Sequence, residues 1–163
     1  MQTKTLHIVR HGKAVQDMLQ IDDGDRPLIE RGIVASIAVA KRFIAEQALP
    51  DVIVSSHAAR ALHTAHIFAR ELGYMQGKVL VMEDLYFRGV SVISSIIKSA
   101  SDDLDSIMIV GHNPDLSRLA KEFGAPITEI STSGVVSICF QTDCWSKIGE
   151  TDASYSFIDK KEC

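Results

Sequence analysis

Four side chains in the sequence are suited to binding an anion, and each follows a short apolar run. Arg10 and His11 end the first of these runs, Arg60 stands shortly after a second, and His112 follows a third. Guanidinium groups and imidazole rings donate hydrogen bonds that match the oxygens of a tetrahedral anion, above all phosphate. A surface ion pair or a loop hydrogen bond would explain each residue alone, so their shared placement is what predicts a phosphate site.

Apolar periodicity predicts the elements that would carry these side chains. Short runs containing β-branched residues predict strands at 5–10, 51–56, 79–82 and 107–110. Apolar residues recurring every three or four positions predict helices from about residue 30 to before Pro50, from about residue 60 to 72, over 91–98 and over 114–123. Alternating residues at 135–140 and 155–158 predict a terminal hairpin at the margin of the sheet.

Strands that alternate with helices predict a mostly parallel sheet in a three-layer α/β/α arrangement, with right-handed connections. The carboxyl ends of parallel strands lie on one edge, where open sheets of this kind bind ligands. Arg60 stands in the first turn of a predicted helix, and a helix amino terminus also favours anions. We therefore expect one domain over residues 1–163, with the four side chains converging at that edge.

Other polar residues follow the same predicted strands, and the sequence leaves their roles open. Gly12 and Asn113 stand beside the two histidines and are expected next to the phosphate. A further set can supply a proton or contact the substrate: Asp25, Arg26, His57, Glu83 and Asp84. The remaining histidines, at positions 7, 63 and 66, lack this placement and are expected to have structural or solvated roles.

Composition excludes several classes of function. The net charge of -4 and the lack of a Lys/Arg run argue against nucleic-acid binding. Cys139, Cys144 and Cys163 form no C-x-x-C pair, and the acidic loop that ends at Asp25 lacks the spacing of a calcium loop, so no metal is expected. The longest apolar stretch, 33–40, is far shorter than a membrane span, and no signal peptide precedes the first strand. We expect a cytoplasmic protein with reduced thiols and no membrane partner.

The motifs around these residues resemble the histidine phosphatase superfamily over the first 140 residues or so. The resemblance is carried by Arg10-His11-Gly12, Ser55-Ser56-x-x-x-Arg60-Ala61-x-x-Thr64-Ala65 and Gly111-His112. Asp25-Arg26-Pro27-Leu28 with Gly32, and Val110-Gly111-His112-Asn113-Pro114, are similar to the SixA-type phosphohistidine phosphatases of its compact branch. The resemblance implies a phosphoglycerate mutase-like fold without a large inserted subdomain. His57 stands where relatives usually have Pro, and His63 where Gln is common.

The resemblance also implies a mechanism without metal or cofactor. His11 would attack phosphorus as a neutral imidazole, with its other nitrogen held by an acceptor such as a backbone carbonyl. Arg10, Arg60 and His112 would bind the equatorial oxygens, where charge spreads during phosphoryl transfer. Water would then attack phosphorylated His11 and release inorganic phosphate.

The leaving group decides between substrates. Many relatives protonate it with a Glu, but the residues around Glu83 and Asp84 do not match that motif. A weak acid favours phosphohistidine, whose nitrogen leaves more easily than an alkoxide. We therefore expect a signalling phosphatase acting on a phosphorylated protein such as a histidine phosphotransfer domain or a phosphotransferase-system carrier.

The alternatives are a phosphatase for small phosphomonoesters and a non-catalytic module that binds phosphate or a phosphoprotein. A nucleotide-binding Rossmann domain would need G-x-G-x-x-G after the first strand, which is missing.

Overall fold

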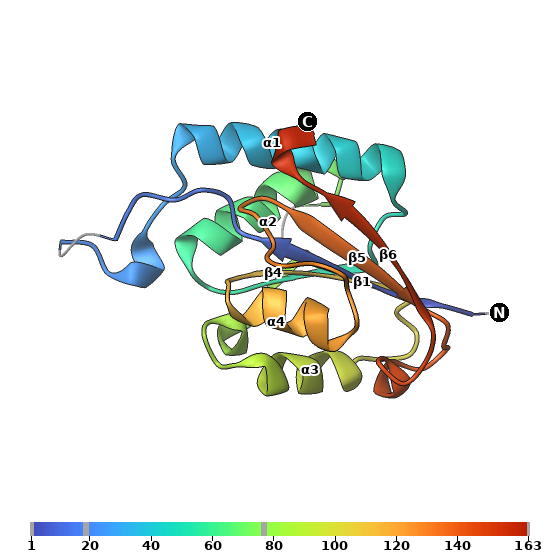
Figure 1. The fold of residues 1–163 in the computed structure, drawn as a ribbon. Coiled ribbons are helices and arrows are strands. Elements are labelled where there is room, and N and C mark those ends of the chain that lie inside the picture. The colour runs from blue at the N-terminus through green and yellow to red at the C-terminus, as the bar shows by residue number, and fades with distance from the viewer. Residues whose placement is uncertain (1, 18–19, 76–77, 163) are drawn as a thin grey trace.

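The computed structural model describes residues 2–17, 20–75 and 78–162 (Figure 1). Its six strands form one sheet in the order β3-β2-β4-β1-β5-β6. The strands are β1 (Lys4–Arg10), β2 (Val52–Ser55), β3 (Val79–Val81), β4 (Ser106–Gly111), β5 (Val135–Phe140) and β6 (Ala153–Ile158). The first four pair in parallel, whereas β5 is antiparallel to both β1 and β6. The expected parallel sheet with a marginal hairpin is confirmed; Cys163 lies outside the described residues.

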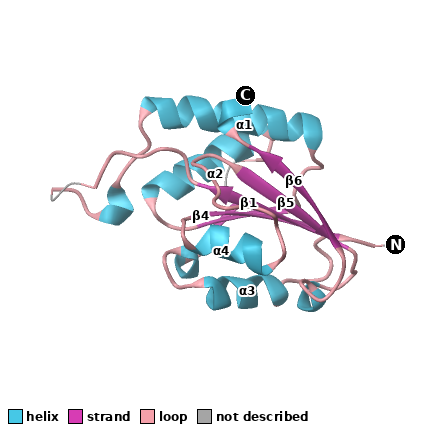
Figure 2. Ribbon diagram, viewed as in Figure 1, coloured by secondary structure: helices cyan, strands magenta, loops and turns pink. Residues whose placement is uncertain are grey.

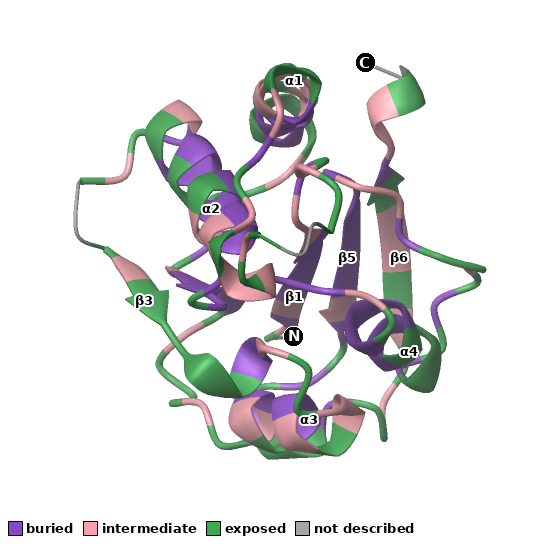
Figure 3. Ribbon diagram, turned by 90° about the vertical axis from the view of Figure 1, so that its left-hand side faces the viewer, coloured by how far each residue is buried: buried purple, intermediate pink, exposed green. Residues whose placement is uncertain are grey.

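Helices cover both faces of this sheet, as the three-layer prediction required (Figure 2). On one face lie α1 (Glu30–Glu46) and α2 (Ala59–Glu71), and on the other α3 (Val90–Lys98) and α4 (Asp115–Glu122). Each face has its own apolar core. Phe43 and Phe68 pack with β-strand residues on the first face, and Leu116 and Leu119 on the second. The burial pattern in Figure 3 shows α2 and α4 with buried sides, while β3 at the sheet edge is largely exposed.

The register of the central strands decides where the polar strand ends lie. β1 pairs with β4 so that Arg10 stands opposite Gly111, and His11 and His112 therefore leave the sheet side by side. β2 joins the same edge because Ser55 pairs with Val110. Among the described residues, no helix is long and apolar enough to cross a membrane. In the same part of the chain, no three His, Cys, Asp or Glu side chains gather as a metal site would require.

Candidate active site

His11 is held in an orientation that leaves one ring nitrogen available as a nucleophile. Its Nδ1 lies 2.7 Å from the carbonyl oxygen of Gly12, which can only accept, so the proton sits on Nδ1. Its Nε2 lies 3.4 Å from Nε of Arg60. Burial, reinforced by the positive charges of Arg60, Arg10 and Arg26, lowers the pKa of His11 to about 4 despite the opposing bond to Gly12. The ring is therefore neutral at pH 7, with its lone pair on Nε2.

The guanidinium of Arg60 is buried and is fixed by Asp23. Its side chain is only 1% exposed, and it donates to the backbone oxygen of Asp23 at 2.6 Å and to its Oδ2 at 2.9 Å. Burial opposes ionisation of Asp23, but hydrogen bonds from Tyr86, Arg60 and Arg26 together lower its pKa far below the usual range. Asp23 is thus an ionised anchor for two arginines.

His112 presents a second imidazole beside the first. The two ring centroids are 5.1 Å apart. The Nε2 of His112 lies 2.8 Å from Oγ of Ser56, which also accepts the backbone N–H of Ala58. If the Ser56 hydroxyl donates to Nε2, the proton of the ring is on Nδ1, the buried atom that has no partner. Burial and the neighbouring charges of His11 and Arg60 lower the pKa of His112 to about 3. In that tautomer the ring keeps one N–H that no atom of the described residues accepts.

Arg10 is tied to the segment around Ile130 by one end of its guanidinium. Its Nη1 donates to the backbone oxygen of Ile130 at 2.9 Å and approaches Oε1 of the exposed Glu129 at 3.3 Å. Its Nε is buried without a partner. The carboxylate of Glu129 is weakly held, so Arg10 keeps donors that an incoming anion can use.

Gly12 and Asn113 do not offer the free phosphate donors that we expected. The N–H of Gly12 donates to Oγ1 of Thr64 at 2.9 Å, and the amide of Asn113 bonds Ile130 and Ser117. Gly12 and Asn113 are thus bonded within the protein, to Thr64 and to Ile130 and Ser117. A Cβ at position 12 would lie 2.7 Å from Oγ of Ser36, so Gly12 is needed for close packing of the loop on α1.

The residues with open roles divide into two groups. Arg26 forms an ion pair with Asp23 at 2.8 Å, and the exposed ring of His57 packs 4.9 Å from that of Tyr86, so these two border the site. The others face solvent: Asp25 and Glu83 are exposed, and Asp84 lies 3.8 Å from the exposed Arg88. The short turn Glu83–Leu85 thus exposes both of its acids and buries Leu85.

Two aromatic residues that the sequence analysis did not single out line the site. The ring centroids of Tyr86 and Phe87 lie 5.2 Å and 4.9 Å from that of His112, and the hydroxyl of Tyr86 donates to Asp23. Phe87 is 49% exposed and has φ of 53°, a conformation rare for a bulky residue. We call His57, Tyr86 and Phe87 the aromatic wall. The available signal was that all three residues lie in the segments that follow β2 and β3.

Known proteins resemble this chain in both sequence and fold. The family model of the histidine phosphatase superfamily (branch 1) matches residues 6–86. An uncharacterized chloroplastic protein of Arabidopsis thaliana is 24% identical over 153 residues, which are 89% of this chain and 70% of the relative.

Two solved structures share the fold over nearly the whole chain. A candidate SixA phosphohistidine phosphatase from Nakamurella multipartitia has a TM-score of 0.81 and 20% identity, covering 98% of this chain and 97% of its own. The protein histidine phosphatase SixA complexed with tungstate has a TM-score of 0.80 and 21% identity, covering 97% and 98%. The matched family segment begins in β1, which delivers Arg10 and His11, and ends at Tyr86 of the aromatic wall. On these grounds the chain resembles the histidine phosphatase superfamily, in sequence over residues 6–86 and in fold over nearly the whole chain.

Proposed function

We propose that this protein is a metal-independent phosphatase in which His11 carries the phosphoryl group between substrate and water. The observation that supports this best is the state of the His11 ring. Its Nδ1 is tied to the carbonyl of Gly12, and its Nε2 lies 3.4 Å from a guanidinium that is itself fixed by Asp23. A neutral imidazole in this position needs no base to become a nucleophile.

The first step transfers the phosphoryl group to the enzyme. Nε2 of His11 attacks phosphorus, the bond to the leaving group breaks, and the leaving group takes the bonding electron pair. Arg60, Arg10 and Nδ1–H of His112 bind the equatorial oxygens, where the charge is spread. The phosphorylated ring becomes positively charged, and its Nδ1–H shares that charge with the carbonyl of Gly12.

In the second step water attacks phosphorus, and the electron pair of the P–N bond returns to Nε2. A proton of the water passes to phosphate or to solvent. Phosphate leaves and His11 is neutral again.

Protein phosphohistidine is the substrate that we propose, because of what the site offers to a leaving group. Asp23, the carboxylate bound to Arg60, is held ionised and has no proton to give. An alkoxide must gain a proton on leaving, whereas a phosphohistidine ring already protonated on its other nitrogen leaves as neutral imidazole. The aromatic wall beside His112 provides flat surfaces against which such a ring can stack.

A basic groove next to Arg10 favours a protein as the carrier of that phosphohistidine. The groove has a volume of about 460 Å³, and its lining includes Arg10, the exposed Arg118 and Lys121 of α4, and Glu129. The chain as a whole is acidic, so the positive charge of this groove would attract an acidic partner to this one part of the surface. It fits an acidic surface around the phosphorylated residue of a phosphotransfer domain or carrier protein.

The test compares leaving groups at equal enzyme concentration. We expect kcat/KM to be highest for a phosphohistidine protein, lower for free phosphohistidine, and at least ~100-fold lower for phosphoserine peptides and alkyl phosphates. Comparable turnover of alkyl phosphates would instead assign a small-molecule phosphomonoesterase. Saturable binding of a phosphoprotein without release of phosphate would assign a binding module.

A further inference from the structure

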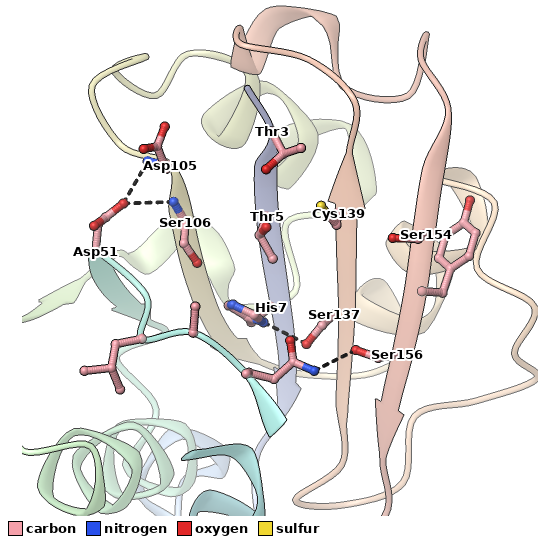
Figure 4. Close-up of a pocket in the computed structure, with 14 residues that line it drawn as sticks. Thr3, Thr5, His7, Asp51, Asp105, Ser106, Ser137, Cys139, Ser154 and Ser156 are labelled. Atoms are coloured by element: carbon pink, nitrogen blue, oxygen red, sulfur yellow. Dashed lines mark hydrogen bonds between the residues drawn. The ribbon is translucent and has the colours of Figure 1, made fainter. Parts of the chain in front are cut away.

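A second polar hollow lies at the end of the sheet opposite His11 (Figure 4). It has a volume of about 430 Å³, within the range of small-molecule sites. Its floor is formed by the first residues of β1 and β4 and by β5 and β6, and its side by the segment 47–49 that follows α1. We call this hollow the distal pocket. The mechanism above uses none of its residues.

Strand register covers the floor of the distal pocket with small polar side chains. His7 stands opposite Ser137, which stands opposite Ser156. One step along the same face, Thr5 stands opposite Cys139, which stands opposite Ser154. Because α1 ends at Glu46, its Phe43 reaches His7 but the helix does not extend over the rest of these two cross-strand rows.

Two buried polar atoms of the lining have no hydrogen-bond partner among the residues that the structure describes. His7 is 1% exposed, and its Nδ1 lies 2.7 Å from Oγ of Ser137, but its Nε2 has no partner. Ser106 is 8% exposed, and its Oγ also has no partner. A buried polar group without a partner is costly, and native proteins nearly always satisfy it. A bound ligand with hydrogen-bonding groups would satisfy both atoms.

The charges around the pocket select against anions. Burial lowers the pKa of His7 to about 4, so its imidazole is neutral at pH 7. Asp51 and Asp105 are the charged residues of the lining. Asp51 already accepts two backbone N–H groups through Oδ2, and Asp105 is paired with Lys4 at 2.9 Å. The two carboxylates therefore repel phosphorylated molecules, and the polar side chains on the floor of the pocket are uncharged.

We propose that the distal pocket binds a small neutral molecule with several hydroxyl groups, of the size of a monosaccharide or cyclitol. Hydroxyls both donate and accept, so they match a lining of Ser and Thr side chains in either orientation. Nε2 of His7 and Oγ of Ser106 are the two buried anchors for this ligand.

The experiment follows the ring nitrogens of His7 by NMR while neutral polyols are added to the full-length protein. The probes are glucose, galactose, myo-inositol and glycerol, with inorganic phosphate and butylamine as anionic and cationic comparisons. We expect at least one neutral polyol to shift Nε2 of His7 saturably with a Kd of about 1 mM or tighter. Phosphate and butylamine should leave this resonance in place.

Two exposed serines provide matched variants that test the pocket and leave His7 intact. Ser154→Tyr fills the pocket from β6, whereas Ser95→Tyr places the same side chain on α3, away from it. Polyol affinity should fall at least ~10-fold in S154Y and be unchanged in S95Y. The proposal is overturned if no neutral polyol gives saturation near ~1 mM, if phosphate or butylamine shifts His7 more strongly, or if S154Y binds as the parent does.

Discussion

At the scale of single residues, the reactivity of His11 depends on a chain of contacts that ends at Tyr86. Tyr86 donates to Asp23, Asp23 holds Arg60 at 2.9 Å, and Arg60 lies 3.4 Å from Nε2 of His11. Each link restricts the next, so the guanidinium is oriented before any substrate arrives. Preorganised donors of this kind stabilise charge in the transition state without having to reorganise.

This series of contacts predicts that Arg60→Lys keeps the charge at position 60 but loses most of the enzyme's activity. A lysine ammonium cannot make the two parallel bonds to Asp23 and face His11 at the same time. We expect kcat/KM for a phosphohistidine substrate to fall ~100- to 1,000-fold in steady-state assays. Arg70→Lys, at an exposed position of α2, is the control and should leave activity unchanged. Near-parental activity of the R60K variant would show that the planar guanidinium is not required.

The sequence predicted that His11, Arg10, Arg60 and His112 would lie together, as they do, but it did not identify the residues that orient them. Asp23 is one of several aspartates in a polar loop, and nothing local separates it from Asp25, two residues away. The backbone of the short turn Asp23–Asp25 directs Asp23 toward Arg60 and leaves Asp25 exposed. Such turns carry no apolar periodicity, so pattern analysis does not detect them.

At the scale of elements, the loop after β1 is held close to α1 by two glycines. A Cβ at Gly32 would lie 2.1 Å from the backbone oxygen of Lys13, and one at Gly12 would lie 3.0 Å from the oxygen of Gly32. The same loop carries the carbonyl that orients His11. The contact between α1 and this loop therefore also sets the geometry of the nucleophile.

Gly32→Ala tests this contact because backbone, rather than a flexible side chain, must move to admit the methyl group. We expect a loss of about 1–3 kcal/mol in the free energy of unfolding, measured with urea. Turnover should fall as well, since the Gly12 carbonyl shifts with the loop. Gly24→Ala is the matched control, because nothing lies within 4 Å of its added Cβ. Equal stability of G32A and the parent protein would contradict the tight packing of α1 on the loop.

Periodicity predicted the regular elements well and the connections poorly. The strands and helices were predicted close to where they lie because their apolar residues face one of two cores. Glu83 and Asp84 were expected to supply a proton or contact the substrate because they follow β3. Both are exposed, whereas the rings of Tyr86 and Phe87, a few residues later, lie against His112. Which side of a turn faces the site depends on φ and ψ, which the residue types there do not determine.

At the scale of the whole molecule, burial of three histidines links folding to pH. Burial is the largest cause that lowers the pKa of His7 and His11 to about 4 and of His112 to about 3. All three bind protons more tightly in the unfolded chain, where the pKa is about 6.5. Stability is therefore complete above pH 6.5 and is lost as the pH falls toward 4.

His7→Gln isolates one of these contributions away from the candidate active site. Between pH 7 and pH 5 the neutral form of His7 accounts for about 2 kcal/mol of the parent's loss of stability. We expect H7Q to be less stable at pH 7 because His7 packs against Phe43 and bonds Ser137. Its free energy of unfolding should nevertheless change less between the two pH values. The same pH dependence in H7Q and the parent would show that His7 is not held neutral by folding.

Charge on the surface of α4 tests the docking of a protein substrate. Arg118→Glu in the basic groove should lower kcat/KM for a phosphohistidine protein ~10-fold, mainly at low ionic strength, and leave turnover of free phosphohistidine unchanged. Arg70→Glu makes the same charge change on α2 and is the control. A similar loss on both substrates, or in both variants, would contradict a specific docking surface. The sequence alone could not reveal this groove or the distal pocket, since each depends on which helices and strands become neighbours.

The central claim is that His11 carries the phosphoryl group, and trapping the intermediate tests it most directly. Enzyme mixed with a phosphohistidine protein is quenched in alkali within milliseconds, digested, and examined by mass spectrometry. We predict a phosphorylated peptide that contains His11, forms before phosphate is released, and loses its phosphoryl group in acid. The same peptide from His11→Ala should be unmodified, and that variant should not turn over. Phosphate release by H11A at the parental rate, or a phosphoryl group on any other residue of the active enzyme, would contradict the account.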